Sequence, residues 1–200
     1  MRLFGKNIGI AMTGSFCTLA EMICEIEILI KEEGAVITPI LSEMVDETDT
    51  RFGRAVGWKD ELERIGCKPP ILTIPQAEPI GPRGMFDVLV IAPCSGNTLA
   101  KLANGITDGS VLMAAKSHLR NQRPVVLSVS TNDGLGFNAK NLGILLNSKN
   151  IYMVPFGQDN PKEKANSLRS DVSKIAETVV EAMFGRQIQP VLLQYPSIMI

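Results

Sequence analysis

The fold is decided by Val90 to Gly109, the stretch VIAPCSGNTLAKLANGITDG. Its apolar start continues a run that begins at Phe86, FDVLVIA, and a continuous run of this length is typical of a strand buried on both faces of a parallel sheet. A polar turn with glycine follows, and the residues after the turn have the apolar spacing of an amphipathic helix. The middle of the chain is therefore predicted to be a strand, a tight turn and a helix.

The same alternation continues on both sides of this stretch. Short apolar runs predict further strands at residues 7–12, 35–41, 124–130 and near 151, and helical spacing predicts helices at 19–30 and from about 167 to 184. Strands that alternate with helices pair in parallel through right-handed crossovers. The sequence therefore predicts an α/β fold, a three-layer sandwich with a mainly parallel, Rossmann-like or flavodoxin-like sheet.

Local signals mark the ends of several elements. Ser15 or Thr18 can cap the first helix, and Glu21 is placed to close a capping box on Thr18. Gly34 stands where a left-handed residue ends that helix. Pro39 favours an edge or strand-end position for the last residues of the second strand, because proline cannot donate to a ladder of hydrogen bonds.

The region between the second and third strands is expected to be irregular. One helix is predicted within 42–66, with four apolar residues facing inward: Phe52, Val56, Leu62 and Ile65. Residues 67–84 contain five prolines, which exclude a long helix and indicate a loop.

Composition narrows the class of protein. A chain of 200 residues with 45% apolar content is long enough for one core, so residues 1–200 are expected to form a single domain. The formal net charge of -1, from 20 basic and 21 acidic residues, gives no electrostatic footprint for nucleic acid or an anionic membrane. No signal peptide or membrane span is predicted, so a cytoplasmic location is expected.

The four cysteines are scattered along the chain. They form no CxxC pair and have no neighbouring histidine cluster, which argues against a structural zinc site and against a disulfide scaffold. Cys17, Cys24, Cys67 and Cys94 are therefore expected to be free and mostly buried thiols, and Cys94 is assigned to packing.

Small polar residues follow four of the predicted strands. They are Thr13, Gly14 and Ser15; Ser42; Ser95, Gly96, Asn97 and Thr98; and Ser130, Thr131 and Asn132. Ligands of open parallel sheets bind beyond the carboxyl ends of the strands, where glycine and helix N-termini suit a phosphate group. The alternative is that these residues are ordinary helix caps. Neither GxGxxG nor a P-loop motif is present, so a mononucleotide such as FMN remains.

At these positions the sequence resembles a known family. The segments TGSFCT, PCSGNTLAKLANGITD and STND are similar to the FMN-binding signatures of the flavoprotein family that includes flavin-containing cysteine decarboxylases and flavin prenyltransferases. The agreement runs from about Asn7 to about Pro155. The resemblance implies FMN as cofactor and a homo-oligomer, a trimer or a dodecamer built from trimers, with the flavin near subunit contacts.

The resemblance also implies roles for individual residues. Asn97 matches the asparagine that faces the substrate in the decarboxylases, so a catalytic role is expected for it, whereas Thr131 matches only by position. Cofactor contacts are implied at Gly14, Ser15, Phe16, Ser42, Ser95, Gly96, Asn97, Thr98, Thr131 and Asn132.

The chain departs from both of the family's known chemistries. The decarboxylases carry a histidine on the helix after the second strand, but the only histidine here is His118, which is expected at the surface or at a helix C-terminus. No cysteine follows Cys94, where the pantothenoylcysteine decarboxylases have a lid cysteine. The Arg-Glu segment of the prenyltransferases is replaced by the residues from Ser130 to Asp133.

Two long blocks resemble one branch of the family, PCSGNTLAKLANGITDGSVLMAAKSHLRNQRPVVL and NDGLGFNAKNLGILLNSKNIY. In that branch the flavoprotein works with a separate A subunit on a small dicarboxylate, in the mother-cell cytoplasm of a sporulating bacterium. The resemblance implies that this dicarboxylate is a dihydropyridine, which loses two hydrogens to become an aromatic pyridine. FMN suits that reaction, because its ring can accept a hydride. Arg51 and Arg54 are candidates for binding the carboxylates, and the alternative is that they form a solvated helix face.

Three functions remain open at this stage. The chain is a flavin-dependent oxidoreductase subunit, a decarboxylase that has replaced its histidine, or a flavin-binding partner that serves another catalytic chain.

Overall fold

The computed structural model describes residues 1–194, and its centre is a seven-stranded sheet. The strands are β1 Asn7–Met12, β2 Val36–Leu41, β3 Val88–Cys94, β4 Val125–Thr131, β5 Ile151–Met153, β6 Phe156–Gly157 and β7 Leu168–Ser170. The first five pair in parallel in the order β2-β1-β3-β4-β5, which is the flavodoxin-like order. The predicted mainly parallel sheet is confirmed.

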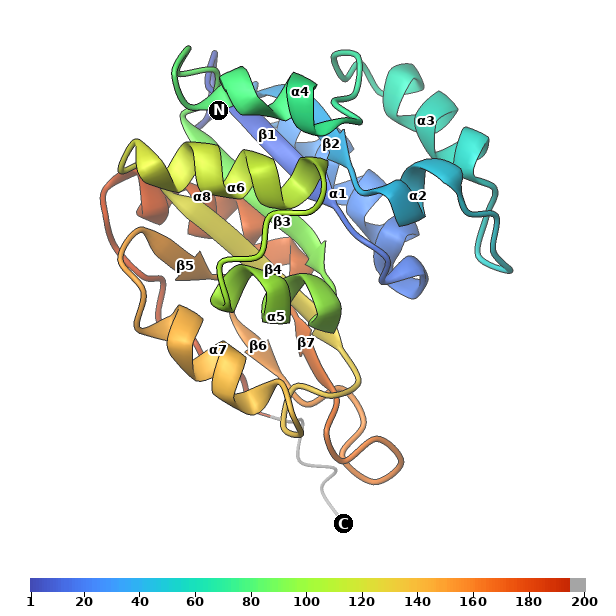
Figure 1. The fold of residues 1–200 in the computed structure, drawn as a ribbon, viewed down its shortest axis with the longest axis vertical. Helices are drawn as coiled ribbons and strands as arrows, with labels where there is room; N and C mark the ends of the chain where they lie inside the picture. Colours follow the sequence, from blue (N-terminus) through green and yellow to red (C-terminus); the bar gives the residue numbers. More distant parts are fainter. Residues whose placement is uncertain (195–200) are drawn as a thin grey trace.

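Helices cover both faces of this sheet (Figure 1). Helices α1 Leu19–Lys31 and α8 Ile175–Met183 lie on one face. On the other face lie α5 Gly96–Ala103, α6 Ser110–Arg120 and α7 Ala139–Leu146. Shorter helices complete the chain: α2 Glu43–Glu47, α3 Ala55–Arg64 and α4 Ile74–Ala77, with single 3₁₀ turns at Phe16–Thr18, Glu78–Ile80 and Val172–Lys174. The three-layer sandwich is confirmed.

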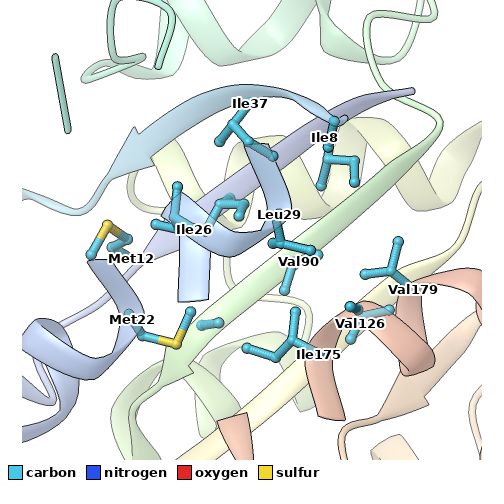
Figure 2. Packing of buried hydrophobic residues seen from close by; sticks show 14 of the residues in the cluster. Ile8, Met12, Met22, Ile26, Leu29, Ile37, Val90, Val126, Ile175 and Val179 are labelled. Atoms are coloured by element: carbon cyan, nitrogen blue, oxygen red, sulfur yellow. The ribbon is translucent and has the colours of Figure 1, made fainter. Parts of the chain in front are cut away.

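Alternating side chains of the central strands build a core on each side. Val88 and Val90 of β3 face α1 and α8, and Leu89 and Ile91 face the opposite layer. All seven residues of β3 are buried, as its continuous apolar run predicts. Figure 2 shows the first core, where side chains of α1 and α8 lie over side chains of the strands. The helices contribute Met22, Ile26, Leu29, Ile175 and Val179, and the strands contribute Ile8, Met12, Val90 and Val126. Each large aliphatic side chain so buried contributes about 1.5–3 kcal/mol.

The signals at element ends have mixed outcomes. Gly34 has the left-handed φ of 75°, and Pro39 lies on the edge strand β2, so both predictions are confirmed. The capping box is wrong: the Thr18 hydroxyl donates to the Ser15 carbonyl at 2.8 Å, and Glu21 pairs with Arg169. A partner distant in sequence has taken the carboxylate that local spacing assigns to the cap.

The region 42–66 contains two helices, α2 and α3, rather than the single helix predicted. A turn closed by two backbone hydrogen bonds between Thr50 and Gly53 separates α2 from α3. Leu62 and Ile65 are buried as expected, but Phe52 and Val56 are each 44% exposed. Phe52 lies in the turn itself, and helical spacing places Val56 of α3 on the side away from Leu62 and Ile65.

The helix predicted from about residue 167 begins later, at Ile175. Residues Leu168–Ser170 instead form β7, which runs antiparallel to β4 through the pairs Ser130–Arg169 and Thr131–Leu168. The piece near 151 is likewise two strands, β5 and β6. Strands of two or three residues are too short to show an alternating pattern.

Two predictions about burial need correction. Cys17 and Cys24 are exposed, Cys67 is partly buried and Cys94 is buried, so the thiols are free but not mostly buried. His118 lies in the last turn of α6, but it is fully buried rather than at the surface. Within the described residues, no helix has both the length and the apolar character needed to cross a bilayer.

Candidate functional site

The carboxyl ends of β1 and β3 meet at the point where the chain order of the sheet reverses, which is where ligands of this topology bind. The hydroxyl of Thr13 joins the loops after these two strands. It donates to the Pro93 carbonyl at 2.7 Å and accepts from the Ser95 amide at 2.9 Å. Because Thr13 is buried, this pair of bonds fixes the two loops relative to one another.

A second hydroxyl ties the same edge to β4. Ser15 Oγ donates to the Ser130 carbonyl at 2.7 Å. Ser15 is expected from the sequence to contact a ligand phosphate, but its proton is already used within the protein. The loops after β1, β3 and β4 are therefore held together by side-chain to backbone bonds.

A large cleft of about 720 Å³ opens beside these loops. It is lined by segments 14–18, 51–52, 95–96 and 130–132 and by residues from 159 to 169. A small cleft of about 410 Å³ lies next to it and is lined by residues from segments 13–14, 42–44, 95–101 and 108–112. The two clefts share Gly14 and Ser95, and each has a volume typical of small-molecule sites, about 300–1,000 Å³.

The small cleft contains a buried hydroxyl without a partner. Ser42 follows β2 and lines this cleft, and its Oγ is buried and makes no hydrogen bond within residues 1–194. Ser42 does not cap α2 with its side chain. A buried hydroxyl without a partner is costly, so this one fits a ligand that accepts or donates a hydrogen bond there.

Two longer helices begin at the small cleft. The first turn of α6 contributes Ser110, Val111 and Leu112 to its lining, and the first turn of α5 contributes Asn97 and Thr98. The first N–H groups of a helix lack partners within the helix and carry its positive dipole end. Anions bind well at such places.

Ser95 acts mainly as a helix cap. Its Oγ accepts from the Thr98 amide at 3.3 Å and lies 3.0 Å from the Thr98 hydroxyl. For this residue the alternative of an ordinary cap therefore applies, although the hydroxyl also lines both clefts.

Gly96 allows a close approach between α5 and the end of β4. A Cβ atom at Gly96 would lie 2.5 Å from Thr131 Oγ1 and 2.9 Å from Asn138 Nδ2. Thr131 Oγ1 in turn accepts from the Asp133 amide at 3.2 Å. The absence of a side chain at position 96 thus sets where Thr131 stands in the large cleft.

The structure divides the predicted site residues between the two clefts. Asn97, which is expected to face the substrate, lines the small cleft together with Ser42. Arg51 lines the large cleft, and Arg54 lines neither of the two. The predicted residues in the large cleft are Gly14, Ser15, Phe16, Ser95, Gly96, Thr131 and Asn132, and those in the small cleft are Gly14, Ser42, Ser95, Asn97 and Thr98.

Several residues of the large cleft are not predicted from the sequence. Asp159, Lys164, Ser167 and Arg169 all lie between β6 and β7 or on β7, in a region expected to be loop and helix. The pairing of β7 with β4 brings them to the cleft. The only sequence signal for these cleft residues is a run of small polar and charged residues ahead of the expected helix. Such a run does not identify an antiparallel hairpin.

Two further side chains are unsuited to catalysis. Burial raises the pKa of the Cys94 thiol to about 12, so Cys94 stays protonated and is a poor nucleophile. Burial also lowers the pKa of His118 to about 4, and His118 stands at the opposite end of α6 from the small cleft. The burial of Cys94 and the position of His118 agree with the expectation that neither side chain acts in the reaction.

The fold and the two clefts have counterparts among known proteins. Residues 2–184 match the Flavoprotein family. The chain is also 45% identical over 192 residues to the B subunit of dipicolinate synthase from Bacillus subtilis (strain 168), and the match covers 96% of each chain. The chain belongs to the flavoprotein family, among its dipicolinate synthase B subunits. The predicted resemblance is confirmed for both the family and the branch.

Solved structures of flavoproteins agree with the fold. The crystal structure of the dipicolinate synthase B subunit from Bacillus halodurans has a TM-score of 0.89 at 45% identity and covers 97% of this chain and 99% of its own. A dodecameric FMN-dependent UbiX-like decarboxylase from Escherichia coli has a TM-score of 0.60 at 21% identity, covering 94% and 98%. At 21% identity, the similarity to the Escherichia coli structure shows a shared fold and nothing more.

Proposed function

We propose that this flavoprotein binds FMN across the two clefts, with the phosphate in the small cleft and the ring in the large one. The observation that carries the proposal is the convergence of four strand ends around two clefts that meet at Gly14 and Ser95. A ring joined to a phosphate by a flexible chain suits two adjoining clefts of unequal size.

The small cleft suits a phosphate group without a free cation. Lys101 lines it, but Lys101 Nζ pairs with Asp108 at 2.5 Å. The N-termini of α5 and α6 supply positive potential, and the free Ser42 hydroxyl supplies a hydrogen bond. Asn97 lies in the same cleft, so we assign it to the cofactor rather than to the substrate.

The large cleft suits the flavin ring and a substrate beside it. Phe16 offers an apolar surface, Thr131 and Asn132 offer polar groups, and Arg51 contributes a cation from the turn between α2 and α3. When bound, FMN supplies an acceptor for two electrons transferred as a hydride. Arg51 then holds and orients a carboxylate of the substrate, because a guanidinium pairs well with that group.

We further propose that the protein acts as a single flavin-binding domain with a separate A subunit. The reaction is the conversion of dihydrodipicolinate to dipicolinate, pyridine-2,6-dicarboxylate, in the mother-cell cytoplasm of a sporulating bacterium. The relative from Bacillus subtilis carries the name of this enzyme's B subunit, which supports the assignment. A homo-oligomer is part of the proposal, since the Escherichia coli relative is dodecameric, and sedimentation as a monomer at high concentration contradicts that part.

The test combines cofactor binding with turnover. The purified protein is titrated with FMN and followed by flavin absorbance, and it is then mixed with the A subunit and dihydrodipicolinate, with and without FMN. We expect tight FMN binding and dipicolinate formation that requires both chains and FMN. A protein that takes up no FMN overturns the cofactor assignment, and full activity of the A subunit alone overturns the role in the reaction.

A further inference from the structure

The large cleft has an excess of positive charge. Three basic residues line it, Arg51, Lys164 and Arg169, against one acidic residue, Asp159. The chain as a whole has a formal net charge of -1, so this concentration of cations is local. A concave site lined by one sign of charge favours ligands of the opposite sign.

Only part of this charge is neutralised within the protein. Arg169 pairs with Glu21, and this partner raises the pKa of Arg169. Arg51 and Lys164 form no ion pair with any acidic group in residues 1–194. The Arg51 guanidinium instead lies 4.8 Å from the centre of the Phe52 ring. Lys164 lies close enough to Asp159 for their charges to interact, although the two form no ion pair. Arg51 and Lys164 are therefore the cations of the cleft without an ion-pair partner among the described residues.

The two free cations come from separate loops. Arg51 lies in the turn between α2 and α3, and Lys164 lies between β6 and β7. Figure 1 shows the turn at the right of the view, outside α2 and α3, and the β6–β7 loop at the lower end of the molecule. Both residues nevertheless line the same cleft, which has a volume of about 720 Å³.

The loop that carries Lys164 has a defined shape. The Lys164 amide donates to the Asn160 carbonyl at 2.8 Å, and Gln158 Nε2 donates to the Ala165 carbonyl at 2.8 Å. The loop is tied to the segment after β4 by the Leu135 amide, which donates to the Asn166 carbonyl at 3.0 Å. These bonds hold the backbone of Lys164 at the cleft, so less conformational entropy is lost when its side chain binds a ligand.

We propose that Lys164 is the second carboxylate-binding residue of the large cleft, and that Arg51 and Lys164 together select a dicarboxylate over a monocarboxylate. The inference rests on the proposed function, which supplies the pyridine dicarboxylate, and it assigns a residue that the sequence did not identify. Arg51 takes one carboxylate and Lys164 takes the other. Arg169, already paired with Glu21, forms part of the cleft wall and is assigned no carboxylate.

The physical basis is a difference between two ligands. A dicarboxylate pairs with both cations, whereas a monocarboxylate leaves one of them without an anion. Selectivity is a difference of affinities, so removing either cation lowers the preference even when overall binding persists. A charge-assisted hydrogen bond at each carboxylate makes the effect measurable.

The test measures the binding of dipicolinate and of picolinate, which lacks one carboxylate, to the FMN-loaded protein by calorimetry. The variant Lys164→Gln is expected to reduce the ratio of the two affinities by about tenfold, and Lys164→Arg is expected to retain it. Lys162→Gln is the matched control, because Lys162 lies on the same loop but outside the cleft lining.

The outcomes separate this inference from the proposed function. An unchanged ratio in Lys164→Gln, with FMN binding intact, overturns the inference and leaves the proposed function standing. Loss of FMN affinity in Lys164→Gln also overturns it, because the residue would then serve the phosphate. A wild-type protein that binds no FMN overturns the proposed function, and the same ratio measured without FMN still decides the role of Lys164.

Discussion

The Ser15 hydroxyl donates a 2.7 Å hydrogen bond to the Ser130 carbonyl and joins the turn after β1 to the end of β4, 115 residues away. The variant Ser15→Ala leaves that carbonyl without this partner and is expected to lower the free energy of unfolding by about 1 kcal/mol. It should also weaken FMN binding, because the ends of β1 and β4 are no longer tied. Urea denaturation and FMN titration measure the two effects. Ser148→Ala, which removes an exposed bond to the Ile144 carbonyl, should leave FMN affinity unchanged.

Loss of the Ser42 hydroxyl should affect the cofactor more than the fold. Ser42 Oγ is buried and unpartnered among the described residues, so Ser42→Ala is expected to keep or slightly raise the stability of the protein without FMN. FMN affinity should fall about tenfold, because hydrogen bonds to charged groups are the stronger ones. Riboflavin, which lacks the phosphate, serves as the control ligand. Equal losses for FMN and riboflavin contradict the placement of the phosphate in the small cleft.

A side chain at position 96 should disturb the large cleft. The Cβ of Gly96→Ala would lie 2.5 Å from Thr131 Oγ1, so we expect a destabilisation of about 1–3 kcal/mol and weaker FMN binding. Gly57→Ala is the matched control within a helix, since nothing lies within 4 Å of its Cβ. That control should stabilise the protein slightly. Thermal unfolding compares the two, and equal behaviour argues against a close approach at Gly96.

The buried imidazole of His118 makes stability depend on pH. Burial lowers its pKa to about 4 in the folded protein, below the ordinary value of 6.5. The unfolded chain therefore binds the proton more readily, and stability falls as the pH drops from 6.5 to 4, by about 3 kcal/mol. Above pH 6.5 the contribution of this group is constant.

The variant His118→Leu isolates that contribution. Urea unfolding at pH 7 and pH 4.5 should show a smaller loss of stability in the variant than in the wild type. Other groups titrate in both proteins and cancel, including Glu25, whose pKa is raised by burial. Identical losses in the two proteins rule out His118 as the source.

Thiol labelling should distinguish the four cysteines. Iodoacetamide is expected to modify exposed Cys17 and Cys24 first, while Cys67 and Cys94, whose pKa burial raises to about 12, react only on unfolding. Because Cys17 lines the large cleft and Cys24 does not, bound FMN should protect Cys17 alone. Peptide mapping by mass spectrometry measures both, and protection of Cys24 contradicts the site.

Sequence patterns predict the parts of the fold that depend on neighbouring residues. The apolar run to Ala92 and the alternation of strands and helices indicate the sheet and its layers, because burial on both faces leaves a clear periodicity. Gly34 and Pro39 are placed correctly because each restricts its own backbone. These signals need no knowledge of distant partners.

The incorrect predictions concern contacts between distant segments. Local spacing assigns Glu21 to a cap, but Arg169, 148 residues away, binds its carboxylate. The strand that contains Arg169 is predicted as helix, so the sequence could not place Lys164 and Arg169 at the cleft. Asn97 and Ser42 are recognisable as site residues, yet only the structure shows that they share one cleft and Arg51 another.

Strand β4 divides its outer edge between two neighbours, with β5 parallel along Val125–Leu127 and β7 antiparallel at Ser130 and Thr131. The hairpin of β6 and β7 is thus appended to a sheet whose other strands are already complete. Insertions, deletions or a transplanted hairpin in this appended unit are expected to alter the wall of the large cleft, which it lines, and to leave the small cleft, which it does not line, unchanged. The β6–β7 hairpin is therefore the part of the fold in which changes of sequence or length would alter ligand choice at the least cost to the sheet.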